Sequence, residues 1–355
     1  MTSVNGYGRL AADSSALRLQ VELLTRQVST GRKAEAQGDI APDLPRALTL
    51  RAEIARRDTY GTAISEALSR SGATQTALQR LGDIAREFAD DVAMKLDPND
   101  PNALSLVAPR AKAALVEVGQ LLDSQSAGEY LFGGSDLRNP PVPDPEGLPG
   151  SGMAQQVAAA VASLGGGNAA AVAAATRAAA MDDSPGVTPF SAFLSDPAAG
   201  LAEPRRAVPA GDGQAVPYGL FANRNAAAAS AGETTGSWAR DLLRGLASLA
   251  ALTPAQTASP DDFRALAGTI RDGLRSAADG IADEAGALGL TEARLTTAKE
   301  QHATLGDALK GQLSDIEEVD LAATLSRLQS TRTALEASYT AIGRLGELNL
   351  TRFLP

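Results

Sequence analysis

Few side chains of this sequence could act on a substrate or hold a metal ion. The chain has no cysteine and a single histidine, His302. Thiol nucleophiles, disulfides, cysteine-ligated zinc and iron–sulfur clusters are therefore excluded, and a Ser-His-Asp triad would have to use His302. No Gly-x-Ser-x-Gly elbow is present to supply the serine, and a single histidine on a helical stretch is typical of a solvated surface. The sequence indicates that the protein is not an enzyme.

Carboxylates are the other candidates for chemistry, because adjacent acidic residues could form an acid–base pair. Such pairs occur at Asp90-Asp91, Asp182-Asp183, Asp261-Asp262 and Glu317-Glu318. Their positions favour solvated faces and helix N-termini over catalytic dyads. Two further carboxylates lie in the segment 97–102, where Pro101 favours a sharp turn over a metal loop. We predict no catalytic residue, no metal site and no cofactor.

The composition narrows the possible partners. The 355 residues carry a formal net charge of −10, and aromatic residues make up only 4%. An acidic chain of this kind is not suited to nucleic acid, which is bound by clustered Lys and Arg. No run of 18 uncharged apolar residues is present, and the N-terminus lacks the layout of a cleavable secretory signal. We expect that the protein does not insert into a membrane. Any export of the protein would need a dedicated system other than the general secretory pathway.

The elements that carry most of the apolar residues lie at the two ends of the chain. Leucines and valines recur at heptad spacing near the N-terminus, and a second series with seven-residue spacing begins at Leu321. We predict that these side chains form an assembly interface: Leu10, Leu17, Val21, Leu24 and Val28 in the first segment, and Leu321, Leu325, Leu328, Leu335, Ile342, Leu345, Leu348 and Phe353 in the second. The first helix should end at Gly31, which can adopt a left-handed cap conformation.

Between the two ends the sequence predicts a helical hairpin followed by a different kind of segment. A long helix is expected over 46–96, and a third helix with a four–three apolar spacing over 104–122. Of the 19 prolines, 11 lie between residues 136 and 217. Residues 154–180 contain 14 alanines, which predicts two helices around the three glycines 165–167, and Gly211-Asp-Gly213 indicates a small hairpin.

Two motifs mark helix starts in the last third of the chain. Ser259-Pro-Asp-Asp262 has the N-cap, proline and acidic first turn of a helix start. Ser314-Asp-Ile-Glu317 has the spacing of a capping box.

The predicted fold is mainly α: a long antiparallel bundle or coiled coil of the N- and C-terminal segments, with a small mixed α/β insert in the middle. We expect five parts: 1–45, an assembly helix and loop; 46–133, a helical hairpin; 134–236, a surface-exposed variable insert; 237–320, returning helices; and 321–355, a second assembly helix. Isolated amphipathic helices are marginal in water, so the terminal stripes need a partner. That partner is either the other end of the same chain or another copy of it.

Several motifs resemble the bacterial flagellin superfamily. Leu23-Leu-Thr-Arg-Gln-Val-Ser-Thr-Gly-Arg32 with Ala47-Leu-Thr-Leu-Arg51 is similar to its N-terminal signature. Ile316-Glu-Glu-Val-Asp-Leu-Ala322, Leu335-Glu-Ala-Ser-Tyr339 and the segment 345–354 resemble its C-terminal end. Gly128-Glu-Tyr-Leu-Phe-Gly-Gly-Ser135 with Pro140-Pro-Val142 is most similar to the third class of hook-associated proteins, which form the hook–filament junction.

The resemblance implies a structural protein of the bacterial flagellum, located outside the cell. It would leave the cell unfolded through the flagellar type III export apparatus with an export chaperone. It would then assemble with copies of itself, with a neighbouring hook-associated protein and with flagellin. Tyr218-Gly219 and Leu242-Leu-Arg-Gly-Leu246 are patterns that filament flagellins share, so a filament subunit is an alternative. A cytoplasmic coiled-coil adaptor is a further alternative.

Overall fold

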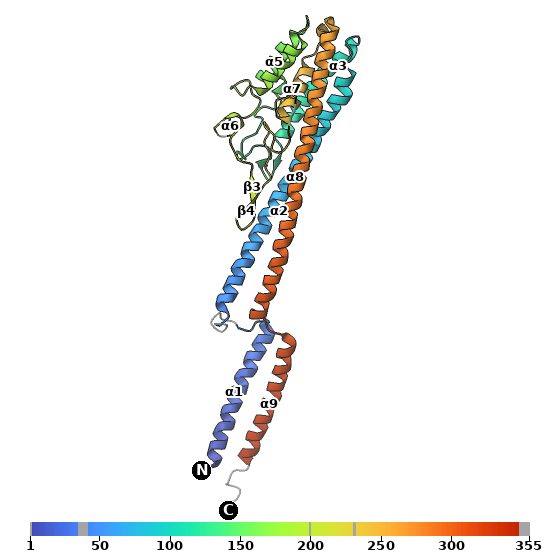
Figure 1. Cartoon of the computed structure of the whole chain (residues 1–355). Coiled ribbons are helices and arrows are strands. Elements are labelled where there is room, and N and C mark those ends of the chain that lie inside the picture. Colours follow the sequence, from blue (N-terminus) through green and yellow to red (C-terminus); the bar gives the residue numbers. More distant parts are fainter. Residues whose placement is uncertain (1, 35–41, 199, 230–231, 348–355) are drawn as a thin grey trace, which may run out of the picture. The chain divides into compact units, whose positions relative to one another are not determined.

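The computed structural model describes residues 2–34, 42–198, 200–229 and 232–347, and within these ranges the chain is mainly helical. Two small antiparallel strand pairs are the only sheets in these ranges, β1 with β2 and β3 with β4. The predicted fold class is confirmed (Figure 1). The main helices are α1 (Thr2–Thr30), α2 (Leu44–Arg86), α3 (Pro101–Leu122), α4 (Gly152–Ala162), α5 (Ala169–Met181), α6 (Ala192–Ser195), α7 (Trp238–Ala250), α8 (Pro260–Glu317) and α9 (Leu321–Glu347).

The chain divides into two compact units. The first, here called the terminal unit, consists of residues 1–59 and 301–355, and the second, the central unit, of residues 60–300. Among the described residues, no helix is long and apolar enough to cross a bilayer.

Two helix pairs form the terminal unit. Helices α1 and α9 lie side by side (Figure 1). The beginning of α2 packs on the end of α8 through a small apolar cluster of Ala47, Leu50 and Ile316. Arg51 adds an ion pair with Glu317 to this contact, at 2.7 Å. The first and last parts of the chain are therefore folded together, which is one of the two arrangements that the heptad spacing allows.

In the central unit, α2 and α8 run antiparallel. Ser71 Oγ donates to Glu292 Oε1 at 2.6 Å, and Gln75 Nε2 donates to the carbonyl of Ala285 at 2.8 Å. After Arg86 the helix continues as a π-helical turn (Glu87–Val92) and a short 3₁₀ turn (Ala93–Lys95), so the predicted helix 46–96 is confirmed. Helix α3 begins at Pro101, three residues before the predicted start, and buries Leu104, Leu115 and Leu122.

Helix α7 is the centre of the central unit, because residues 238–249 are all buried. Helices α3, α4 and α5 pack around it. Trp238 on α7 makes an edge-on contact with Phe132, with 6.4 Å between the ring centroids. Core residues of the segment 134–236, such as Val142 and Val157, belong to the same apolar cluster. The middle segment therefore shares one core with the helices that flank it.

Local motifs of the middle segment form as the sequence indicates. The two alanine-rich stretches are α4 and α5, separated by glycines with positive φ. Strands β3 (Ala207–Gly211) and β4 (Gln214–Pro217) form the expected hairpin, and Gly213 has φ +71° in its turn. Tyr60 Oη donates to Asp212 at 2.8 Å, which attaches this turn to α2. Strands β1 (Gln125–Ser126) and β2 (Glu129–Tyr130) form a second, shorter hairpin.

Two sequence predictions about α8 are wrong. His302 is buried, with 7% of its surface exposed, where a solvated position was expected. The reason is its spacing: His302 follows Leu274, Ile281, Leu288 and Leu295 at seven-residue intervals on the buried stripe of α8. The capping box predicted at 314–317 does not start a helix, because α8 continues to Glu317. The side chain of Asp320 caps α9 instead, accepting from the N–H of Ala323 at 3.1 Å.

The prediction of solvated acidic pairs is wrong at Glu317, whose side chain is 16% exposed and paired with Arg51, and at Asp183. Asp183 is half-buried, and its Oδ1 lies 2.6 Å from Nη2 of Arg240, a residue of the buried helix α7. Such a pair joins residues 57 positions apart, which local spacing cannot indicate. Asp262, by contrast, lies in the first turn of α8 as expected, where it accepts from the N–H of Gly167 at 2.9 Å.

Candidate assembly interface

The stripe predicted on α1 faces α9 of the same chain. Leu24 is 6% exposed, and Leu10, Leu17, Val21 and Val28 are half-buried. Ser14 fills the gap in the heptad and is also buried. It satisfies its hydroxyl within the helix, donating to the carbonyl of Ala11 at 3.0 Å, so a polar residue is tolerated on the stripe.

The stripe predicted on α9 is only partly covered by α1. Leu328 is buried, and Leu335 and Ile342 are half-buried. Leu321 and Leu325 are 49% and 50% exposed, because Thr324, not either leucine, is the buried residue of the first turn of α9. Three predicted residues have no described side chain: Leu345 lies in α9 without a described environment, and Leu348 and Phe353 lie outside the described residues.

Sequence reasoning missed several exposed apolar side chains on these two helices. Leu19 is 67% exposed, Leu23 is 49% exposed, and Tyr339 on α9 is 47% exposed. Leu19 and Leu23 are four residues apart and lie in register with Ala12 and Ala16, which are also exposed. This second stripe on α1 could have been recognised from the same periodicity that marks the first. Each helix of the pair therefore has one covered apolar face and an uncovered apolar edge.

A short backbone link holds the α1–α9 pair to the rest of the terminal unit. The N–H of Lys33 donates to the carbonyl of Glu317 at 2.8 Å, and the N–H of Val319 donates to the carbonyl of Gly31 at 3.0 Å. Gly31 has φ +71°, the predicted left-handed conformation that ends α1. Nζ of Lys33 also donates to the carbonyl of Asp315. These bonds align the end of α1 with the break between α8 and α9.

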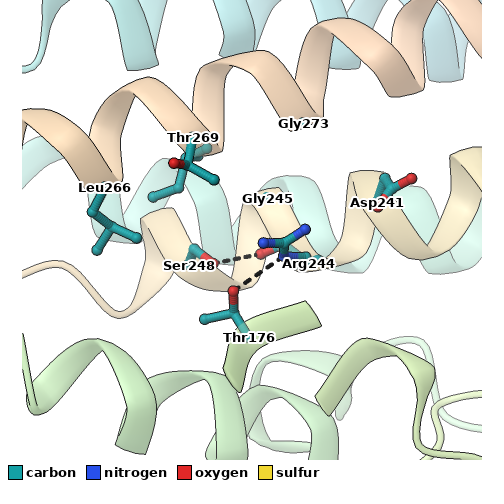
Figure 2. Close-up of a pocket in the computed structure, with 9 residues that line it drawn as sticks. Thr176, Asp241, Arg244, Gly245, Ser248, Leu266, Thr269 and Gly273 are labelled. Atoms are coloured by element: carbon teal, nitrogen blue, oxygen red, sulfur yellow. Dashed lines mark hydrogen bonds between the residues drawn. The ribbon is translucent and has the colours of Figure 1, made fainter. Parts of the chain in front are cut away.

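The central unit holds a small polar cavity beside α7 (Figure 2). Arg244 Nε donates to Thr176 Oγ1 at 3.0 Å, and its Nη2 donates to the carbonyl of Ala173 at 2.8 Å. Burial raises the pKa of Asp241 and lowers that of Arg244 from their usual values. The cavity volume is about 10 Å³, room for about a single water molecule. The cavity is too small for a substrate, and it is lined in part by Asp241, whose buried Oδ2 has no hydrogen-bond partner among the described residues.

The carboxylates of the described residues form no metal centre, because no three of them, with or without His302, lie within reach of one ion in the ranges that the structure covers. Several are engaged in ion pairs or accept hydrogen bonds from backbone N–H groups. Glu129, for example, lies between Arg70 and Arg206, at 3.0 and 2.7 Å, and its hydrogen bond to Arg206 lowers its pKa.

The surface that the geometry favours for function is thus the uncovered edge of the α1–α9 pair. The family model of the bacterial flagellin C-terminal helical region matches residues 272–354, which include the end of α8 and all of α9. Proteins of that family are structural and self-assembling, not enzymes. No curated protein is significantly similar to the chain. Residues 272–354 are thus similar to the C-terminal helical region of bacterial flagellins, which supports a flagellar structural protein.

Proposed function

We propose that the protein is a junction subunit that links the flagellar hook to the filament, and that it assembles through α1 and α9. The observation that carries this proposal is the uncovered apolar edge of α9. Leu321, Leu325 and Tyr339 are each about half exposed although α1 packs beside them. A fully buried leucine stabilises a structure by about 1.5–3 kcal/mol relative to an exposed one. Neighbouring subunits would supply that burial.

The segment 128–142 favours the junction over the filament. It contains the Tyr-Leu-Phe-Gly-Gly and Pro-Pro motifs that resemble hook-associated proteins of the third class. In this chain the motif begins in the β1–β2 hairpin and buries Leu131 and Phe132 in the core of the central unit. The motif therefore has a structural role that a junction protein and its relatives would share.

The partners that follow are other copies of this chain, a neighbouring hook-associated protein and flagellin. The chain would reach the outside of the cell unfolded, through the flagellar type III export apparatus and with an export chaperone. The absence of cysteine is compatible with this route, since an unfolded chain then carries no thiol that could form a stray disulfide.

A filament flagellin is the second candidate. The match of residues 272–354 to the flagellin C-terminal region favours it, as do the Tyr218-Gly219 and Leu242–Leu246 patterns. In that role the protein would be the bulk component of the filament and not a short connecting segment.

Electron microscopy of cells that lack the protein separates the two roles. Loss of a junction subunit should leave bare hooks while intact flagellin is shed into the medium. Loss of the filament subunit should leave no filament protein to shed. Normal filaments on such cells would contradict both roles. Recovery of the protein only from the cytoplasm of wild-type cells would support a coiled-coil adaptor instead.

A further inference from the structure

The terminal unit carries two exposed patches of opposite charge, each with an exposed leucine. Residues 1–33 contain five basic and two acidic side chains, a net charge of +3. Residues 301–320, the last part of α8 and its link to α9, contain one basic and five acidic side chains, a net charge of −4. Both segments belong to a chain whose overall charge is −10, so the positive sign of the first is a local feature.

The basic patch lies at the end of α1. Leu23 is 49% exposed there, and a hollow of about 270 Å³ opens beside it. The side chains around this hollow include Leu23, Arg26, Gln27, Thr30, Arg32 and Lys33. Pockets for small molecules have volumes of about 300–1,000 Å³ and are mostly apolar. This hollow is smaller and basic, which suits one apolar side chain with a carboxylate nearby.

The acidic patch lies on α8. Leu305 is 50% exposed, and Ala308, Gln312 and Asp315 follow it at helical spacing on neighbouring positions of one face. Asp315 is exposed, and its backbone carbonyl accepts from Lys33. This face therefore presents an exposed leucine and a carboxylate further along the helix. The basic hollow suits both, because it has room for the leucine side chain and positive charge for the carboxylate.

Within one chain the two patches meet where Lys33 binds the carbonyl of Asp315, and Leu23 and Leu305 both remain about half exposed. We propose that the patch Leu23–Lys33 of one copy binds the Leu305–Asp315 face of a second copy. This inference rests on the proposed function, since it names the surfaces by which copies associate. The contact joins two different patches, so a pair of copies keeps one free patch of each kind. Contacts of this type extend into chains or rings, whereas a contact between identical patches stops at a dimer.

Crosslinking tests this contact directly, because the natural chain has no cysteine. Full-length Leu23→Cys and Leu305→Cys variants, made with tags of different mass, are mixed under a mild oxidant. The expected result is a disulfide-linked heterodimer in the mixture. The matched control is Leu290→Cys, which replaces another exposed leucine of α8, 66% exposed but outside the acidic patch. Absence of the heterodimer, or equal crosslinking with the control, would overturn the proposal.

A charge exchange between copies gives a second, independent readout. Arg26→Glu or Asp315→Lys alone should raise the protein concentration needed for self-association about tenfold, because each places like charges together. An equimolar mixture of the two should associate nearly as the wild type does, since each altered patch then meets its altered partner. Arg294→Glu, on an exposed position of α8 in the central unit, should have no effect.

The outcomes also separate this inference from the function it rests on. If the wild-type protein associates and neither the mixture nor the crosslink behaves as described, this contact is wrong and the assembly function stands. If sedimentation detects no association of the wild type with itself, and the protein is absent from isolated flagella, both are overturned. Circular dichroism of each variant distinguishes a lost contact from a lost fold.

Discussion

At the scale of single residues, the central unit depends on charges that are buried together with their partners. Arg240 is 6% exposed, and its guanidinium donates to the carbonyls of Ala180 and Asn223, each at 2.9 Å. It also pairs with Asp183 and lies over the ring of Phe190, 5.2 Å from its centroid. One side chain thus connects α5, α7 and the loops between them.

Replacement of Arg240 should therefore be costly. We expect Arg240→Met to reduce the free energy of unfolding by about 3–5 kcal/mol, because it leaves a carboxylate and two carbonyls without their donor. Urea unfolding followed by circular dichroism measures this loss. The control is Arg80→Met, which removes an exposed ion pair with Glu117 and should cost less than about 1 kcal/mol. Equal effects of the two substitutions would contradict this account.

Asp123 makes the stability of the central unit depend on pH. Its Oδ1 accepts from the N–H of Val142 at 2.8 Å, and burial raises its pKa from the usual 3.8 to about 6. The folded state therefore binds the proton more readily than the unfolded state. The stabilising contribution of protonation is complete below about pH 4 and is lost as the pH rises through about 6.

Asp123→Asn tests this dependence, since the amide oxygen can still accept from Val142. We expect the variant to be more stable than the wild type at pH 7, because it buries no charge. The difference should shrink as the pH falls and vanish below about pH 4. Chemical unfolding of both proteins at pH 7, 5.5 and 4 gives the comparison. A difference that does not change with pH would show that charge is not the cause.

At the scale of elements, the β1–β2 hairpin contains a strained turn. Ala127 has φ +52°, the one positive φ at a non-glycine residue among those described, and Gly128 follows with φ +79°. Two successive residues with positive φ are typical of the type I′ turn, which favours Asn-Gly. The turn is followed directly by the core residues Leu131 and Phe132. Their packing determines the position of the hairpin, and Ala127 therefore keeps an unfavourable backbone conformation.

We expect Ala127→Asn to stabilise the central unit by about 0.5–1 kcal/mol, because asparagine adopts the left-handed conformation more readily than alanine. Ala127→Val should destabilise it, since a β-branched side chain is worse in this conformation. Thermal unfolding of the two variants should therefore shift in opposite directions. Shifts of the same sign would contradict the strain argument.

Elements determined by local chemistry could be predicted from the sequence, whereas long-range pairings could not. The start of α8 at Pro260, the end of α1 at Gly31 and the α4–α5 pair follow from caps, glycines and helix propensity. The burial of His302 follows from the four apolar residues that precede it at seven-residue intervals on α8. An argument from the type of this one residue does not take that series into account. The pairing of Arg240 with Asp183 depends on the whole fold of the central unit.

At the scale of the whole molecule, the sequence predicted which faces of the terminal helices are apolar but not what covers them. The same heptad spacing suits a helix of the same chain or of another copy. The structure places α1 against α9 and leaves Leu19, Leu321 and Leu325 about half or more exposed. The candidate interface therefore consists of the apolar residues that α1 and α9 do not bury against each other. No pattern in the sequence indicates which apolar residues are buried within the chain and which stay exposed.

Removal of residues 321–355 should separate folding from assembly. The core of the central unit contains none of these residues, so its unfolding transition should be unchanged. Helix α1 loses its partner, and we expect limited proteolysis to remove residues 1–30 rapidly while the central unit resists. The truncated protein should remain soluble and fail to enter flagella. Incorporation of this truncation at the wild-type level would contradict the role of α9.

The chain has one tryptophan and one histidine, and each lies buried in a different unit. Trp238 is the first residue of α7 and lies against Phe132. Its intrinsic fluorescence will therefore report the melting of the central unit and remain silent when α1 and α9 separate. The imidazole proton resonances of His302 will report the terminal unit in the same sample. Two native reporters, without any label, can thus follow the two halves of this protein independently as it unfolds or joins a flagellum.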